Sequence, residues 1–249
     1  MPLLDRALRD RREIRDSPTP TLVLLPGLDG TDVFLRPLAA ALSPAIRPVV
    51  VTYPIRGAEE YRDVLEMVRR ATDGLSSFYV LGLSYSGPLA VLLGAEQPTR
   101  IKGLILAATF VQAPHPRLRY LRFATSAPTM WLWRVMRRIP IWLCRPPDDA
   151  LRVAKSETFR RVPARCLARR ARAVMDVDVR AALRTCRQPV LCISFAEDRV
   201  VPRGNVDAIL REAPRAASAT VAGGHSSGCT NATVLAAAIE RFISEVESA

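Results

Sequence analysis

The sequence has few of the residues that bind transition metals or cross-link a chain. Of 249 residues, two are histidine and five are cysteine. The cysteine count is odd, and no pair has the spacing of a metal-binding motif. We therefore expect no metal, no cofactor and no disulfide framework, with a reducing cytoplasm as the setting. The cysteines are Cys144, Cys166, Cys186, Cys192 and Cys229.

Long apolar runs are also missing. No stretch reaches the roughly 18 consecutive apolar residues that a membrane-spanning helix needs. Residues 1–20 are rich in arginine and aspartate and lack the continuous apolar segment of a signal peptide. We therefore expect neither a membrane span nor a cleaved leader. The oligomeric state is left open by the sequence.

Lysine is scarce, so the formal net charge of +12 comes almost wholly from arginine. The charge is uneven: residues 113–187 hold 18 basic and 5 acidic residues, against 18 and 19 in the rest of the chain. An arginine-rich composition could arise without function, but such a local field attracts anions. We expect no nucleic-acid partner, because neither aromatic stacking platforms nor a known binding module accompany the charge.

Apolar runs and amphipathic segments alternate along most of the chain. Because most of the expected strands are apolar on both faces, the pattern predicts an α/β fold, with a mostly parallel sheet and helices on both faces. Thr31 or Asp32 is expected to cap the first helix. Strands are expected at 21–27, 46–54, 78–84, 101–110, within 189–202 and at 217–225, and helices at 33–42, 58–74, 88–98, 205–214 and 233–248.

The alternation stops between residues 113 and 187, which predicts a helical lid insertion between two parts of the core, 1–112 and 188–249. This segment contains proline-rich turns, arginine-rich helical pieces and all three tryptophans, within 130–143. The tryptophan-rich stretch is expected either to pack on the core or also to roof an apolar acyl pocket. Its arginines would then favour an anionic part of the substrate or peripheral contact with an anionic lipid surface.

A candidate nucleophile lies in the segment 82–87, Gly-Leu-Ser-Tyr-Ser-Gly, where an apolar strand ends and a helix begins at once. This setting is typical of a nucleophile elbow with Ser84 at its apex. An ordinary strand–turn–helix loop with a serine N-cap is the alternative. Ser86 is a second candidate, but Ser84 and Pro88 stand where small residues should flank a nucleophile.

A serine hydroxyl needs a base to accept its proton, and the base is usually histidine. His225 follows a strand, so it should emerge at the same sheet edge as Ser84, whereas His115 lies between two prolines. An acid must orient the imidazole, and Asp198 at the end of the fifth strand is the first choice, ahead of Glu197. The chain order serine, aspartate, histidine is the order expected for this arrangement.

Acyl transfer also needs two backbone N–H groups to hold the oxyanion. One is expected from Tyr85, which follows the candidate nucleophile. The other is expected from the loop after the first strand, with Leu28 as the choice and Asp29 as the alternative. Gly27 and Gly30 would let that loop approach a substrate closely.

Four motifs together carry a family resemblance: LLPGLDGT, GLSYSGP, FAEDRVVP and GGH. They resemble the α/β-hydrolase superfamily, and among its members short bacterial serine hydrolases with a PGxDGT loop and a GxSxSGP elbow. The resemblance covers residues 21–112 and 188–249 and does not extend to the insertion. Ser86 stands where most members have glycine.

These patterns together predict a serine hydrolase that cleaves carboxylic esters or thioesters through an acyl-enzyme, with Ser84, Asp198 and His225 as its catalytic triad. The partner is expected to be a small ester or acyl compound. Two alternatives remain. An acyltransferase would pass the same acyl group to an alcohol, and a non-catalytic binding protein would use the fold without the chemistry.

Overall fold

A parallel six-stranded sheet forms the centre of the molecule. The computed structural model describes residues 19–55, 60–114, 149–213 and 215–249. Every neighbouring strand pair is parallel, in the order β2-β1-β3-β4-β5-β6, which confirms the predicted α/β class. The strands are β1 (Thr21–Leu25), β2 (Arg47–Val50), β3 (Phe78–Leu83), β4 (Ile101–Ala107), β5 (Val190–Phe195) and β6 (Ala217–Val221).

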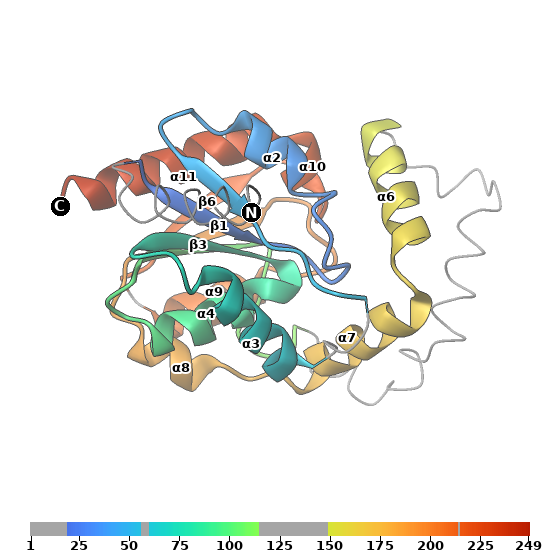
Figure 1. Cartoon of the computed structure of the whole chain (residues 1–249), viewed down its shortest axis with the longest axis horizontal. Helices are drawn as coiled ribbons and strands as arrows, with labels where there is room; N and C mark the ends of the chain where they lie inside the picture. The colour runs from blue at the N-terminus through green and yellow to red at the C-terminus, as the bar shows by residue number, and fades with distance from the viewer. Residues whose placement is uncertain (1–18, 56–59, 115–148, 214) are drawn as a thin grey trace, which may run out of the picture.

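Helices cover both faces of the sheet (Figure 1). In β1, Leu22 and Leu24 pack against one helical layer, whereas Val23 and Leu25 pack against the other, because side chains alternate along a strand. All four are fully buried, as expected for a central parallel strand. The first layer is α2 (Arg36–Ala41) and α11 (Ala232–Glu247); the second is α3 (Tyr61–Thr72), α4 (Gly87–Glu96), α8 (Arg180–Thr185) and α9 (Gly204–Glu212).

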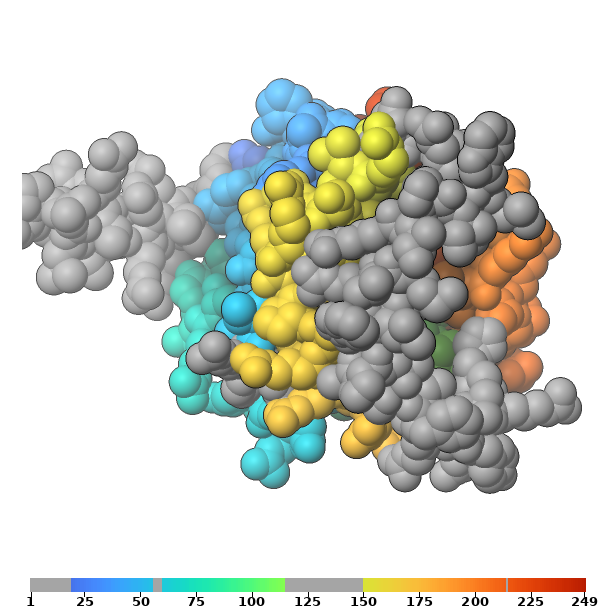
Figure 2. Space-filling model, turned by 90° about the vertical axis from the view of Figure 1, so that its right-hand side faces the viewer, coloured from blue at the N-terminus to red at the C-terminus, as the bar shows by residue number. Residues whose placement is uncertain are grey.

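Three described helices lie between β4 and β5: α6 (Asp149–Arg161), α7 (Ala164–Asp176) and α8. The α8 helix packs against α4 and α9 on the sheet. The α6 and α7 helices instead stand beyond one edge of the sheet (Figure 1), and Figure 2 shows them spread across that face of the molecule. The limits 113–187 stay a prediction, and His115 and the tryptophan-rich stretch 130–143 lie outside the described residues.

The start of α2 differs from the sequence expectation. The helix begins at Arg36, and no side chain caps it. The carboxylate of Asp32 instead accepts a hydrogen bond from Nε of Arg36 at 2.7 Å, and Thr31 is bonded to Asp29. The prediction that Thr31 or Asp32 caps this helix was wrong, because other partners occupy both side chains.

Within the described residues, no helix is both long enough and apolar enough to cross a bilayer.

Candidate active site

The turn after β3 holds Ser84 in a strained conformation. Ser84 opens a short 3-10 helix, η1 (Ser84–Ser86), and its φ angle is 52°. A non-glycine residue in this region costs on the order of 1–3 kcal/mol and persists where the surroundings impose it. Gly82 permits the tight turn, because a Cβ there would lie 2.5 Å from the carbonyl oxygen of Ser86. The hydroxyl of Thr109 donates a hydrogen bond to the carbonyl oxygen of Ser84 and steadies the turn.

Ser86 occupies a different environment from Ser84. Its side chain is fully buried, and its hydroxyl donates a hydrogen bond to the carbonyl oxygen of Pro26. The Tyr53 hydroxyl lies 2.6 Å from the Ser86 oxygen and donates to it. Ser86 therefore connects the turn after β3 to the loop after β1, and both the proton and a lone pair of its hydroxyl are used in that link.

Ser84, His225 and Asp198 form one hydrogen-bonded chain. Oγ of Ser84 lies 2.9 Å from Nε2 of His225, and Nδ1 of His225 lies 2.7 Å from Oδ2 of Asp198. Ser84 lies in η1 directly after β3, His225 lies in the loop before α10 (Ser227–Thr230), and Asp198 lies in the turn after β5. The structure thus brings together the three side chains that the sequence selected, across 141 and 27 residues of chain.

The environment of Asp198 favours its charged form. Burial acts to raise the pKa of Asp198, but the hydrogen bond and charge of His225 outweigh it, so the pKa lies below its ordinary value. Oδ1 also accepts from the backbone N–H groups of Val200 and Val201, at 2.8 and 2.9 Å. The alternative acid, Glu197, is exposed, whereas the Asp198 side chain is 4% exposed.

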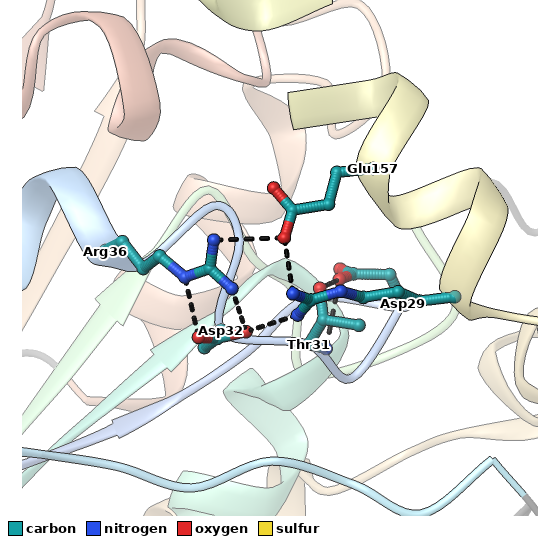
Figure 3. Close-up of polar contacts among 6 residues, drawn as sticks. Asp29, Thr31, Asp32, Arg36 and Glu157 are labelled. Atoms are coloured by element: carbon teal, nitrogen blue, oxygen red, sulfur yellow. Dashed lines mark hydrogen bonds and ion pairs between the residues drawn. The ribbon is translucent and has the colours of Figure 1, made fainter. Parts of the chain in front are cut away.

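The loop after β1 forms a tight turn beside Ser84. The N–H of Gly30 donates to the carbonyl oxygen of Gly27 at 3.0 Å, which sets the orientation of the peptide that carries the Leu28 N–H. The buried Asp29 carboxylate accepts hydrogen bonds from the N–H and hydroxyl of Thr31 (Figure 3). Burial raises the pKa of Asp29, while the bonds from Thr31 oppose that shift.

A pocket of about 580 Å³ opens over these groups. Ser84, His225 and the two residues chosen as oxyanion donors, Leu28 and Tyr85, all line it. Much of the described lining is apolar and comes from both the core and the insertion: Phe34, Leu83, Phe110, Phe159, Leu167, Val174, Met175 and Val201. Such a cavity suits an apolar group attached to a reactive carbonyl.

Arg170, on α7, is a residue that sequence reasoning missed. It is fully buried, and its guanidinium donates to the carbonyl oxygens of Leu28, Asp29 and Pro54. The spacing of buried residues along α7 could have identified Arg170 from the sequence. On a helix, positions three or four residues apart share a face, so Arg170 continues the buried stripe of Cys166 and Leu167.

A second contact between the insertion and the core is exposed. Arg36 pairs with Glu157 at 3.0 Å, and Arg161 pairs with Asp32 at 3.2 Å (Figure 3 labels Arg36, Asp32 and Glu157). Two further ion pairs connect the same side chains: Arg36 with Asp32, and Arg161 with Glu157. We call these four residues the ion-pair cluster. It joins α6 to the segment that begins α2.

Solved structures with this fold include three bacterial enzymes. The enol-lactonase from Burkholderia xenovorans is 19% identical, with a TM-score of 0.76, over 92% of each chain. MenH from S. aureus is 13% identical, with a TM-score of 0.76, over 93% of this chain and 96% of that one. An esterase from Exiguobacterium antarcticum is 16% identical, with a TM-score of 0.72, over 92% of each. At these identities the likeness shows the fold.

The sequence itself identifies the family. No curated protein sequence matches the chain. Residues 57–235 match the model of a hydrolase family described as serine aminopeptidase, S33, and this match spans most of the chain, from α3 to α11. Together with the parallel sheet and its neighbours in structure, the match establishes that this chain is a hydrolase with the α/β-hydrolase fold and belongs to the serine aminopeptidase S33 family.

Proposed function

We propose that this hydrolase cleaves carboxylic esters or thioesters through an acyl-enzyme, with Ser84, His225 and Asp198 as its catalytic triad. The observation that carries the proposal is the hydrogen-bonded chain from Ser84 Oγ through His225 to Asp198, which begins in an apolar pocket. A serine on a turn with φ of 52° and its hydroxyl against an imidazole nitrogen has the geometry of an activated nucleophile.

The geometry supports the following reaction. Ser84 Oγ attacks the carbonyl carbon while His225 Nε2 takes its proton, and Asp198 stabilises the imidazolium that forms. The oxygen that becomes negative is held by the N–H groups of Leu28 and Tyr85. His225 then gives its proton to the departing alcohol or thiol, and the acyl group stays on Ser84. Water then attacks the acyl-enzyme, with His225 again taking the proton, and the carboxylic acid is released from Ser84.

Leu28 is preferred to Asp29 as the oxyanion donor. Hydrogen bonds from Thr31, and a further one from the N–H of Asp29 itself, act to lower the pKa of the Asp29 carboxylate. This interaction competes with a substrate oxygen for the Asp29 N–H. For Leu28, no acceptor of the N–H is recorded within the described part of the chain, and Tyr85 lies in the first turn of η1, where an N–H has no partner within the helix. An N–H without an acceptor is free to bind an oxyanion.

The lining of the pocket favours an ester over a peptide with a free amino terminus. An aminopeptidase needs a carboxylate to bind the substrate ammonium group. Of the described lining residues, Asp29 is the only acid, and Thr31 occupies its carboxylate. The enol-lactonase and esterase among the similar structures are named for ester substrates. We extend that substrate class to this chain.

The insertion is proposed to act as a lid over the acyl pocket. Its α6 and α7 helices supply Phe159, Leu167 and Met175 to the lining, and Lys155 of α6 lines it too. A cationic side chain in a largely apolar pocket fits an acyl compound that carries an anionic group. The proposed limits of the lid are 113–187.

The test is a series of p-nitrophenyl esters and CoA thioesters of increasing chain length, assayed with the wild-type chain and Ser84→Ala. We expect hydrolysis by the wild type, a preference for apolar acyl groups that fill the pocket, and none by the variant. Product that partitions mainly to an added alcohol would identify an acyltransferase instead. Absence of turnover, with tight binding of the esters, would identify a binding protein.

A further inference from the structure

Arg170 places a buried positive charge directly on the loop after β1. Its Nη1 donates to the carbonyl oxygens of Leu28 and Asp29 at 3.1 and 2.9 Å, and its Nη2 donates to that of Pro54 at 2.8 Å. The guanidinium carbon lies 5.5 Å from the centre of the Tyr53 ring. One side chain of the insertion therefore holds two segments of the core, at the point where the proposed oxyanion donor lies.

The loop leaves space for this guanidinium. Gly30 has a φ angle of +71°, which favours glycine. A Cβ at Gly30 would lie 2.4 Å from Nη1 of Arg170 and 2.8 Å from the Cβ of Tyr53. Any larger residue at this position would displace the arginine or the loop. The absence of a side chain at Gly30 therefore makes room for the guanidinium of Arg170.

The side chain of Leu28 is held by the same part of the insertion. It packs against a cluster of buried residues, Val162, Cys166 and Leu167, at the end of α6 and along α7. Both the carbonyl oxygen and the side chain of Leu28 are thus fixed from one side. Leu28 lines the pocket, and no hydrogen bond donated by its N–H is recorded among the described residues.

A buried arginine is costly unless its donors are satisfied. Nη1 and Nη2 of Arg170 donate to backbone carbonyl oxygens of the two loops, whereas its buried Nε has no acceptor among the described residues. Charge-assisted bonds of this kind are stronger than neutral ones, and they polarise the peptides that they reach. An oxyanion hole works only if its donors are in place before the charge develops.

We propose that Arg170 is a positioning residue for the oxyanion hole: it holds the loop after β1 so that the Leu28 N–H faces the carbonyl bound at Ser84. The inference rests on the proposed function. It gives α7 a part in the chemistry as well as in covering the pocket. Arg170 does not touch the substrate, and it acts through Leu28 and Asp29.

The experiment compares Arg170→Lys and Arg170→Ala with Arg172→Ala, which removes an exposed arginine from the same helix. Loss of one oxyanion donor costs about 10²–10³ in kcat, and displacement of the loop should approach that range. We expect Arg170→Ala to lower kcat about 100-fold with little change in KM, and Arg170→Lys to fall between it and the wild type. Arg172→Ala should keep the wild-type kcat.

Two further measurements separate positioning from a purely structural role. A trifluoromethyl ketone adds to Ser84 and generates an oxyanion, so its affinity should fall in parallel with kcat/KM, while the affinity for the product acid stays constant. Guanidinium at sub-denaturing concentration should restore part of the kcat of Arg170→Ala and leave Arg172→Ala unchanged.

Folded Arg170→Lys with wild-type kcat and wild-type affinity for the ketone would overturn the proposal, even if its stability were reduced. This variant keeps the charge and decides the matter if Arg170→Ala does not fold. If the wild type itself neither hydrolyses esters nor reacts with the ketone, the proposed function fails. If the wild type is active and the Arg170 variants match it, only the role of Arg170 fails.

Discussion

The helical insertion contacts the core at two places that differ in burial. At one, Arg170 is fully buried and donates to three backbone carbonyl oxygens. At the other, the ion-pair cluster joins α6 to the start of α2, and its Arg36 and Arg161 side chains are 45% and 48% exposed. The cluster has more charges and more ion pairs, yet water competes for each of them.

We infer from this difference that the number of charged residues in a contact does not indicate how much the contact matters for activity. The buried contact fixes backbone atoms of the loop beside Ser84, the proposed nucleophile, so losing it should alter the proposed chemistry. The exposed contact lies between side chains outside the catalytic chain, so losing it should alter only how firmly α6 rests on the core. The comparison depends on a site centred on Ser84, which the largest predicted effect tests.

Ser84→Ala should lower kcat for ester hydrolysis by about 10⁴–10⁶, because the nucleophile is removed. The matched control is Ser86→Ala, two residues away. It should keep most of the activity but lose about 1–3 kcal/mol of unfolding free energy, because the buried Tyr53 hydroxyl and Pro26 carbonyl lose their partner. The opposite ranking of the two kcat values would move the nucleophile to Ser86 and remove the basis of the comparison.

Asp198→Asn should lower kcat by roughly 10³–10⁴ while leaving the fold intact, because an amide does not stabilise the imidazolium of His225. The measurement is kcat beside a melting curve for each protein. Glu197→Gln is the control, since Glu197 is exposed. If Glu197→Gln loses the activity and Asp198→Asn keeps it, the acid of the triad has been assigned to the wrong residue.

The lowered pKa of Asp198 also predicts how its contribution to stability varies with pH. The pKa of an aspartate in an unfolded chain is about 3.9. A carboxyl group whose pKa is lower in the folded state contributes its full stabilisation at pH values above this unfolded pKa. The stabilisation is lost as the pH falls through the folded pKa. The difference in unfolding free energy between wild type and Asp198→Asn should therefore shrink as the pH falls from about 4 through the folded pKa of Asp198. A difference that grows below pH 4 would contradict the assigned direction.

The smallest effect is expected from the ion-pair cluster. A double-mutant cycle of Arg36→Ala and Glu157→Ala should give a coupling below about 1 kcal/mol, with kcat close to that of the wild type. Raising the salt concentration should reduce the coupling, because exposed pairs are screened. A loss of kcat as large as that of Arg170→Ala would show that both contacts act on the chemistry and would erase the distinction between them.

Much of the core and of the candidate site could be predicted because the relevant information is local. Strands that are apolar on both faces mark a parallel sheet, and chemical groups that follow such strands meet at one edge. Ser84, Asp198 and His225 each follow an expected strand, which is why their proximity was predictable. Their catalytic roles remain proposals.

Arg170 and the start of α2 could not be predicted in the same way. Arg170 is one of many arginines in an arginine-rich segment, and its acceptors lie in loops more than 100 residues earlier. Asp32 looked like a helix cap because its nearest neighbours suggested one, but its carboxylate bonds to Arg36, four residues on, and to Arg161, 129 residues away. Long-range contacts of this kind leave only a weak trace in sequence, such as an arginine on an apolar helical stripe.

The central claim is that Ser84 is an activated nucleophile, and covalent labelling tests it most directly. The folded chain would be treated with a fluorophosphonate probe, and the modified residue located by mass spectrometry. We predict one probe per chain, on the peptide that contains Ser84, with labelling lost in Ser84→Ala and kept in Ser86→Ala. A wild-type chain that stays unlabelled, or that carries the probe on another residue, would contradict the account.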